Sequence, residues 1–142
     1  MIKIDSFELK REQNKLARKI RLQDDFDKLK TIAGVDCIVE GDNILASVVV
    51  CEFPSLKVIE KKTYSLSSPL PYKAGFQAYR EMPAIIEAYN LLDEEPDVIL
   101  VNGLGVNHPR KFGMAAHLGL ALNKPTIGVT QKLPFGKVEN GK

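Results

Sequence analysis

Two polar residues, Asp36 and Asn102, stand at the ends of apolar runs that have the composition of β-strands. Asp36 lies near the end of the run TIAGVDCIV at 31–39, and Asn102 directly follows the run DVILV at 97–101. If the two strands are parallel neighbours, both side chains project toward the edge where open α/β sheets bind ligands. Both side chains carry oxygen atoms, which hard divalent cations prefer as ligands. The sequence therefore predicts a ligand site at this edge.

The formal net charge of +2 conceals an uneven distribution of charged residues. Residues 1–21 carry seven Lys/Arg and three Asp/Glu, residues 22–104 carry seven and fourteen, and residues 105–142 carry six and one. Basic ends around an acidic middle suit a protein that grips phosphates at its edges and holds divalent cations at its centre. Solvated charged faces are the alternative interpretation.

The pattern of apolar residues predicts one domain over residues 1–142, with a basic N-terminal helix in 1–29 and a core over 30–136. We expect the first helix to run from Ser6 to about Leu29, with Asp5 or Ser6 as its N-cap. Pro83 is expected at the first position of a helix. The other predicted elements are three antiparallel strands near 31–39, 44–53 and 56–66, a helix over 83–95, strands at 97–101 and 125–129, and a helix over 114–122. This order predicts an α/β fold of the ribonuclease H-like type, a mixed five-stranded sheet flanked by helices.

The chain contains neither a membrane-spanning run nor a secretion signal. No apolar run approaches the roughly 20 residues that cross a bilayer, and the first twelve residues, MIKIDSFELKRE, are charged. We therefore expect a cytoplasmic protein with no membrane partner. Cys37 and Cys51 lie in apolar runs and form neither a CxxC pair nor a zinc spacing with His108 and His117, which favours buried free thiols.

Four strings occur in the same order as in the endonuclease V family, and the chain resembles that family over about 31–136. They are IAGVD at 32–36, PSLKVIE at 54–60, PYKAGFQAYRE at 71–81, and VNGLGVNHPRKFGMAAHLGLALNKPTIGV at 101–129. The resemblance implies a nuclease that repairs nucleic acid. Such an enzyme recognises deaminated purines, chiefly inosine in DNA or RNA, and hydrolyses a phosphodiester on the 3′ side of the lesion with Mg²⁺ or Mn²⁺ as cofactor.

The resemblance also implies roles for three residues at the metal site. Asp36 matches the central metal ligand and Glu81 the second acid, both of which would also be catalytic. Asn102 stands where the family carries Asp, so one metal ligand loses its negative charge and we expect weaker cation binding. Without the resemblance, Asp36 would be interpreted as a turn cap and Glu81 as a solvated residue near a helix terminus.

The resemblance implies a base pocket and a wedge that inserts beside the lesion. Tyr72 matches the wedge, although PYKAG lacks the family's second proline, and the pocket positions are Gly103, Gly105, Asn107, His108 and Gly113. We expect Tyr72 to stack on a base. His108 before Pro109 is more often a structural hydrogen-bonding residue than a catalytic base, and we expect His117 to be packed. Candidate phosphate contacts are Lys73, Arg80, Arg110 and Lys111.

The chain departs from the family at two further points. Gln131 falls on the position of a catalytic lysine and Lys132 follows it, so Lys132 is the candidate, aimed at the opposite face if strand geometry persists. Family members also continue beyond the length of this chain.

Three hypotheses stay open from the sequence. The first is an active nuclease, with a partner chain supplying the missing C-terminal segment. The second is a catalytically impaired nucleic-acid-binding or regulatory remnant of the family. The third is a homo-oligomer, in which a second copy covers the exposed apolar surface.

Overall fold

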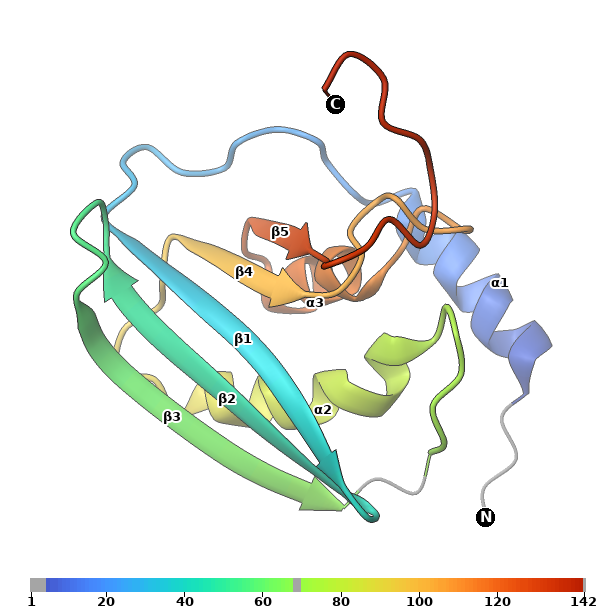
Figure 1. Ribbon diagram of the computed structural model, residues 1–142, viewed down its shortest axis with the longest axis horizontal. Coiled ribbons are helices and arrows are strands. Elements are labelled where there is room, and N and C mark those ends of the chain that lie inside the picture. The colour runs from blue at the N-terminus through green and yellow to red at the C-terminus, as the bar shows by residue number, and fades with distance from the viewer. Residues whose placement is uncertain (1–4, 68–69, 142) are drawn as a thin grey trace.

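The computed structural model describes residues 5–67 and 70–141, and its centre is a mixed five-stranded sheet (Figure 1). Two helices, α2 and α3, cover one face of this sheet. The elements in chain order are α1 (Ser6–Ala17), β1 (Thr31–Glu40), β2 (Asn43–Glu52), β3 (Val58–Ser67), α2 (Gln77–Asn90), β4 (Val98–Asn102), α3 (Met114–Leu122) and β5 (Thr126–Val129). The predicted fold class and the order of its elements are confirmed.

The strand order β3-β2-β1-β4-β5 places the two halves of the chain side by side. β1, β2 and β3 form an antiparallel meander, whereas β4 pairs in parallel with β1, and β5 with β4. In the β1/β4 register Val35 lies opposite Val101, so the following residues, Asp36 and Asn102, lie at the same level of the sheet. The two strands therefore bring these polar side chains together as the sequence predicted.

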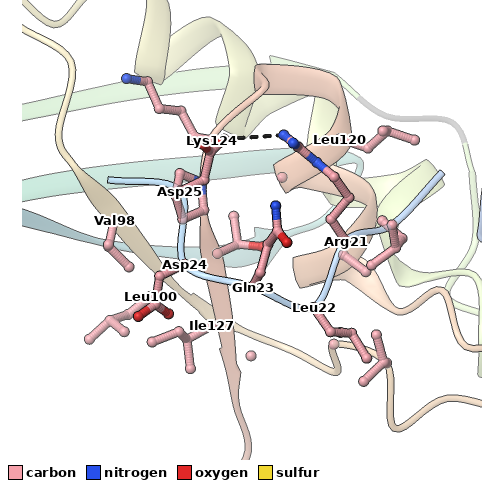
Figure 2. Close-up of a pocket in the computed structure, with 18 of the residues that line it drawn as sticks. Arg21, Leu22, Gln23, Asp24, Asp25, Val98, Leu100, Leu120, Lys124 and Ile127 are labelled. Carbon is pink, nitrogen blue, oxygen red and sulfur yellow. Dashed lines mark hydrogen bonds and ion pairs between the residues drawn. The ribbon is translucent and has the colours of Figure 1, made fainter. Parts of the chain in front are cut away.

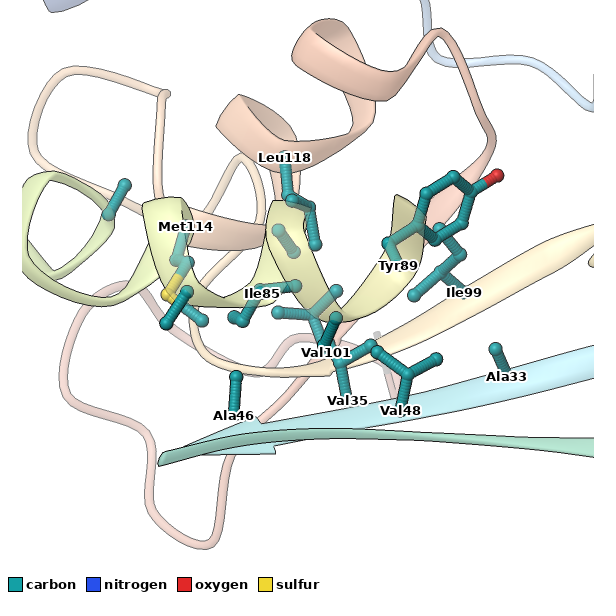
Figure 3. Packing of buried hydrophobic residues seen from close by; sticks show 14 of the residues in the cluster. Ala33, Val35, Ala46, Val48, Ile85, Tyr89, Ile99, Val101, Met114 and Leu118 are labelled. Carbon is teal, nitrogen blue, oxygen red and sulfur yellow. The ribbon is translucent and has the colours of Figure 1, made fainter. Parts of the chain in front are cut away.

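Alternation along the strands sends every second side chain into one core between the sheet and the two helices (Figure 3). Ile85 and Tyr89 of α2 and Met114 and Leu118 of α3 pack onto the strands. Their partners on the sheet are Ala33, Val35, Ala46, Val48, Ile99 and Val101. Burying each aliphatic side chain contributes about 1.5–3 kcal/mol, so this core holds β1 and β4 firmly beneath the site.

The first helix is shorter than predicted, because α1 ends at Ala17 and residues 18–30 are irregular. Asp5 caps the helix by accepting hydrogen bonds from the N–H groups of Phe7 and Glu8. Beyond Ala17, three Asp residues of low helix propensity follow at 24, 25 and 27, and Phe26 falls outside the apolar stripe of the helix. The predicted helix over 1–29 is wrong past residue 17, and its first four residues lie outside the described part of the chain.

The second helix starts earlier than predicted, at Gln77, and Pro83 lies inside it. Pro83 is exposed and lacks the N–H that would donate to the carbonyl of Tyr79, one helical turn earlier. Glu81 consequently belongs to the helix itself and does not precede it. None of the described helices is long and apolar enough to cross a membrane.

Candidate active site

A hydrogen-bonded pair of side chains joins the middle of β1 to the carboxyl end of β4. Asn102 Nδ2 donates to Asp36 Oδ1 over 3.0 Å, and the backbone N–H of Cys37 donates to the same oxygen over 2.8 Å. Both side chains are exposed. The carboxylate of Asp36 is therefore accessible, but one of its oxygens already accepts two hydrogen bonds.

Glu81 approaches the pair from α2 and differs from Asp36 in its surroundings. Only 9% of its surface is exposed. Burial raises the pKa of Glu81, the nearby charge of Asp36 raises it further, and a hydrogen bond from Gln77 and the charge of Arg80 oppose the rise. Two carboxylates thus face one region, one solvated and one largely desolvated, and a cation between them would relieve their repulsion.

Gln77, which the sequence analysis did not single out, connects the acids to the loop after β4. Its Nε2 donates to the backbone carbonyl of Asn102 over 3.3 Å, and its side chain hydrogen-bonds Glu81 one helical turn later. The signal in the sequence was the i, i+4 spacing of Gln77 and Glu81 at the start of α2, which puts both side chains on one face. With the helix predicted to start at Pro83, this spacing fell outside the helix.

The donor set of this site fits one divalent cation held by few protein ligands. Asp36, Glu81 and the amide of Asn102 can supply oxygen atoms, and Mg²⁺ usually takes one or two carboxylates together with water. Within residues 5–67 and 70–141 no group of three or more His, Cys, Asp or Glu side chains could hold a metal ion. The Asn102 amide presents its N–H to Asp36, so its own oxygen becomes a ligand only after the amide turns over.

Beside this site lies a cavity of about 520 Å³, large enough for a nucleobase. Four of the six predicted base-binding residues line it, namely Tyr72, Gly103, His108 and Gly113. Gly105 and Asn107 do not; they line a second cavity on the other side of the loop. Tyr72 is 65% exposed at the cavity, as a stacking residue needs to be.

The glycines of the loop permit backbone contacts within the protein. A Cβ on Gly113 would lie 2.3 Å from the carbonyl oxygen of Leu104, and the Gly113 N–H donates to Gly105 over 2.9 Å. A Cβ on Gly103 would meet Gln77 Oε1 at 3.3 Å. At Gly113 the missing side chain thus permits a close approach between Leu104 and the start of α3.

His108 is a buried structural residue whose two ring nitrogens both have hydrogen-bond partners. Nδ1 accepts from the backbone N–H of Arg110 over 3.1 Å, which leaves Nε2 to donate to the carbonyl of Gly75 over 2.9 Å. Burial lowers the pKa of His108, so the neutral ring persists at physiological pH. Its side chain therefore forms part of the cavity wall, with both ring nitrogens already hydrogen-bonded within the protein.

The four predicted phosphate contacts have different surroundings. Arg110 hydrogen-bonds Gln13 and the Gly75 carbonyl, and Lys73 donates to Ser6, so both are engaged within the protein at the cavity. Arg80 lies half-buried next to Glu81 and lowers that residue's pKa. Lys111 is exposed beside the cavity loop.

The strand that was expected to orient Lys132 ends before it. β5 stops at Val129, and both Gln131 and Lys132 follow in an exposed irregular segment, where the Lys132 carbonyl accepts from Thr130 Oγ1 over 2.7 Å. The alternation of side chains across a strand therefore does not determine the direction of Lys132. Its side chain does not line the 520 Å³ cavity.

The second cavity is larger, about 800 Å³, and lies away from the acids. The irregular segment after α1 crosses the sheet face opposite α2 and forms one wall, with Leu100 and Ile127 beneath it (Figure 2). Arg21 and Asp25 of that segment form an ion pair of 3.2 Å. None of Asp36, Glu81 and Asn102 lines this cavity, whereas Asn102 lines the smaller one, which we therefore consider the candidate site.

The comparisons with known proteins agree in one family. The family model for endonuclease V matches residues 14–142. Among solved structures, the catalytic domain of human endonuclease V matches with 35% identity and a TM-score of 0.82 over 92% of this chain and 60% of that one. Endonuclease V from Bacillus subtilis matches with 35% identity and a TM-score of 0.82 over 99% and 60%.

A third structure contains nucleic acid. Ciona intestinalis endonuclease V in complex with a DNA containing an inosine followed by a ribo-adenosine matches with 31% identity and a TM-score of 0.84, over 89% of this chain and 57% of that one. The chain thus spans about three fifths of the length of these three relatives.

Proposed function

Because the chain belongs to the endonuclease V family, we propose that it acts on nucleic acid containing deaminated purines, by metal-dependent hydrolysis of a phosphodiester on the 3′ side of inosine. The observation that carries the proposal is that one short segment serves both halves of the site. Asn102 holds Asp36 by its side chain, and Asn102 and Gly103 also line the 520 Å³ cavity. A base held in the cavity would therefore have its phosphate near the acids.

The cavity supports recognition of a flat base that has left its stack. Met114 and Phe112 provide apolar lining, and Tyr72 at its rim is available to stack on a base, which contributes roughly 1–3 kcal/mol. Gln77 and the backbone of Gly103 supply polar groups to the same wall. Inosine differs from adenosine by an oxygen and a ring N–H, so polar groups on this wall would distinguish the two bases.

The residues that would hold a divalent cation are Asp36, Glu81 and Asn102. A bound Mg²⁺ or Mn²⁺ would supply an activated water and charge stabilisation at the scissile phosphate. Asp36 would bind as the exposed carboxylate, and Gln77 would orient Glu81 by their hydrogen bond. Desolvation of Glu81 strengthens its attraction to a cation, since charges interact more strongly where water is excluded.

A second candidate function, binding of the lesion without cleavage, is favoured by one observation. The Asn102 amide donates to one of the two Asp36 oxygens that could bind a cation, and it adds no charge of its own. Removing this hydrogen bond costs about 1 kcal/mol before a cation binds. The pocket does not depend on that charge, so recognition would survive where hydrolysis is lost.

One experiment on the whole chain distinguishes the two functions. Wild type, Asp36→Ala and Asn102→Asp are incubated with duplex and single-stranded oligonucleotides, of DNA and of RNA, that carry inosine or adenosine at one position, in Mg²⁺ and in Mn²⁺. Metal-dependent nicking beside inosine that disappears in Asp36→Ala supports the nuclease and excludes binding alone. Preferential binding of inosine without nicking, in wild type and Asn102→Asp alike, excludes the nuclease.

The proposal also includes association of this chain with a second copy or with another chain. Ile127 and Val129 of the edge strand β5 are more than half exposed, which suits a second copy or another chain that covers them. Analytical ultracentrifugation of the same samples measures self-association. A monomer at every concentration would exclude the second copy.

A further inference from the structure

The carbonyl oxygen of Gly75 accepts hydrogen bonds from three separate side chains. Gln13 Nε2 donates over 2.8 Å, His108 Nε2 over 2.9 Å, and Arg110 over 3.3 Å. These donors come from α1 and from the loop before α3, whereas Gly75 belongs to the connection that carries Tyr72. Three segments far apart in the sequence therefore meet at one backbone atom.

Gln13 is the residue that joins α1 to both other segments. It is 1% exposed in a helix whose other described residues are at least partly exposed. Its Nε2 donates to Gly75, and its Oε1 accepts from Arg110 Nε. A buried polar side chain of this kind is costly unless it is fully hydrogen-bonded, and here both ends of the amide have partners.

Arg110 is fixed by the same arrangement. Its guanidinium lies 4.8 Å from the ring centre of Phe76 and also hydrogen-bonds the Gln13 amide. The backbone N–H of Arg110 also donates to His108, so the loop is anchored by side chain and main chain together. Removing Gln13 would leave Arg110 without the acceptor for its Nε and the Gly75 carbonyl with fewer donors.

The bonded groups form part of the wall of the 520 Å³ cavity. Gln13, Gly75, His108 and Arg110 all line it, together with Tyr72. The position of Tyr72 relative to the loop of Gly103 and Gly113 therefore depends on the hydrogen bonds at Gly75. A change of about 1 Å in this wall would alter the fit of a base without changing the outer surface.

We propose that Gln13 is a positioning residue, which holds residues 72–76 and the loop 107–113 in register and thereby sets the preference of the cavity for a deaminated purine. The selectivity part rests on the proposed function, whereas the positioning part does not. Gln13 lies just before the segment that the family model matches, 14–142. It acts through Gly75 and Arg110, not by touching the base.

The test compares Gln13→Leu with Gln13→Glu and, as a control on the same helix, Asn14→Ala at an exposed position. Fluorescence anisotropy gives the dissociation constants for oligonucleotides with inosine and with adenosine in a chelator, and their ratio is the preference. In Gln13→Leu we expect the preference to fall about fivefold, the equivalent of one lost hydrogen bond, with adenosine binding unchanged. Gln13→Glu keeps an acceptor for Arg110 but loses the donor to the Gly75 carbonyl, so it should lose part of the preference, whereas Asn14→Ala should retain all of it.

A merely structural role would weaken binding of both oligonucleotides in equal proportion, and that result would overturn the proposal. Retention of the wild-type preference for inosine in Gln13→Leu would also overturn the proposal. Amide hydrogen exchange of the free protein is measured in parallel, and exchange in residues 72–76 and 107–113 should rise in Gln13→Leu and stay unchanged in Asn14→Ala. If wild type shows no preference for inosine, the proposed function fails, and unchanged exchange in Gln13→Leu would independently refute the positioning role.

Discussion

Replacing Asn102 by Asp should strengthen cation binding at the proposed site and lower stability without cation. Asn102 Nδ2 lies 3.0 Å from Asp36 Oδ1, so the substitution exchanges a hydrogen bond for a repulsion between two carboxylates. Both side chains are exposed, and the interaction is therefore closer to the water limit than to the protein interior.

The magnitude follows from that distance. Two unit charges about 3 Å apart repel by about 1.4 kcal/mol in water, and the lost hydrogen bond adds roughly 0.5–1.5 kcal/mol. Without cation we expect Asn102→Asp to lower the free energy of unfolding by about 2 kcal/mol, or the unfolding temperature by roughly 7 °C. A cation at about 100 times its dissociation constant would stabilise the variant by about 2.7 kcal/mol and offset the loss.

Thermal unfolding in EDTA and in Mn²⁺ measures both effects, with isothermal calorimetry for the dissociation constant. Wild type should show a smaller rise with Mn²⁺, because its site has one carboxylate fewer. Asn14→Asp, a charge change at an exposed position of α1, should match wild type in both buffers. The reasoning is refuted if Asn102→Asp is as stable as wild type in EDTA, or if Mn²⁺ stabilises the two equally.

Three further predictions concern the burial of polar groups and the glycine turn. Burial raises the pKa of Glu81, so the protein loses stability as pH rises and this carboxyl ionises. Glu81→Gln should therefore raise the free energy of unfolding by about 1 kcal/mol, measured by denaturant unfolding at neutral pH in a chelator. Burial lowers the pKa of His108 and His117, so stability should be full above the ordinary value of 6.5 and fall as pH drops through the folded pKa values; a double His→Asn variant should lose this dependence. Gly75 has a φ of +84°, and a Cβ added there would lie 2.7 Å from the guanidinium of Arg110, so Gly75→Ala should lower the free energy of unfolding by about 2 kcal/mol. The control is Gly41→Ala, where φ is +60° and nothing lies within 4 Å of the added Cβ.

The sheet and its central pair were predictable because both follow from local patterns. Alternation of apolar residues identified the strands, and the order of elements implied that β4 lies beside β1. Asp36 and Asn102 then had to meet, since each follows a paired position in a parallel register. The end of α1 was missed because apolar residues continue past Ala17 but, in the structure, line a cavity wall instead of a helix stripe.

The polar contacts of the site could not be predicted, because they join residues distant in the sequence. Gln13 and Gly75 are 62 positions apart, and nothing in the composition of a basic helix marks one Gln as buried. Gly105 and Asn107 were predicted in the base pocket with Gly103, yet of the two cavities they line only the one of 800 Å³, whereas Gly103 lines both. Neighbours in one loop share a motif without sharing a cavity, and only the path of the backbone separates them.

The structure also predicts that base recognition and cation binding respond independently to substitution. Gln13 has Gly75 and Arg110 as partners, whereas the Asn102 side chain has Asp36, so the two share no hydrogen-bond partner. Effects at sites without shared partners usually add to within about 0.5 kcal/mol. The double variant Gln13→Leu/Asn102→Asp should therefore combine the lost inosine preference with the full response to Mn²⁺.

Gln77 is the residue through which this independence would fail. It hydrogen-bonds the Asn102 carbonyl and Glu81, and it lines the cavity wall. A coupling of more than about 1 kcal/mol between the two substitutions would mean that movement of the wall reaches the acids through this side chain. Repeating the cycle in a Gln77→Ala background would then abolish the coupling, because the link between wall and acids is gone.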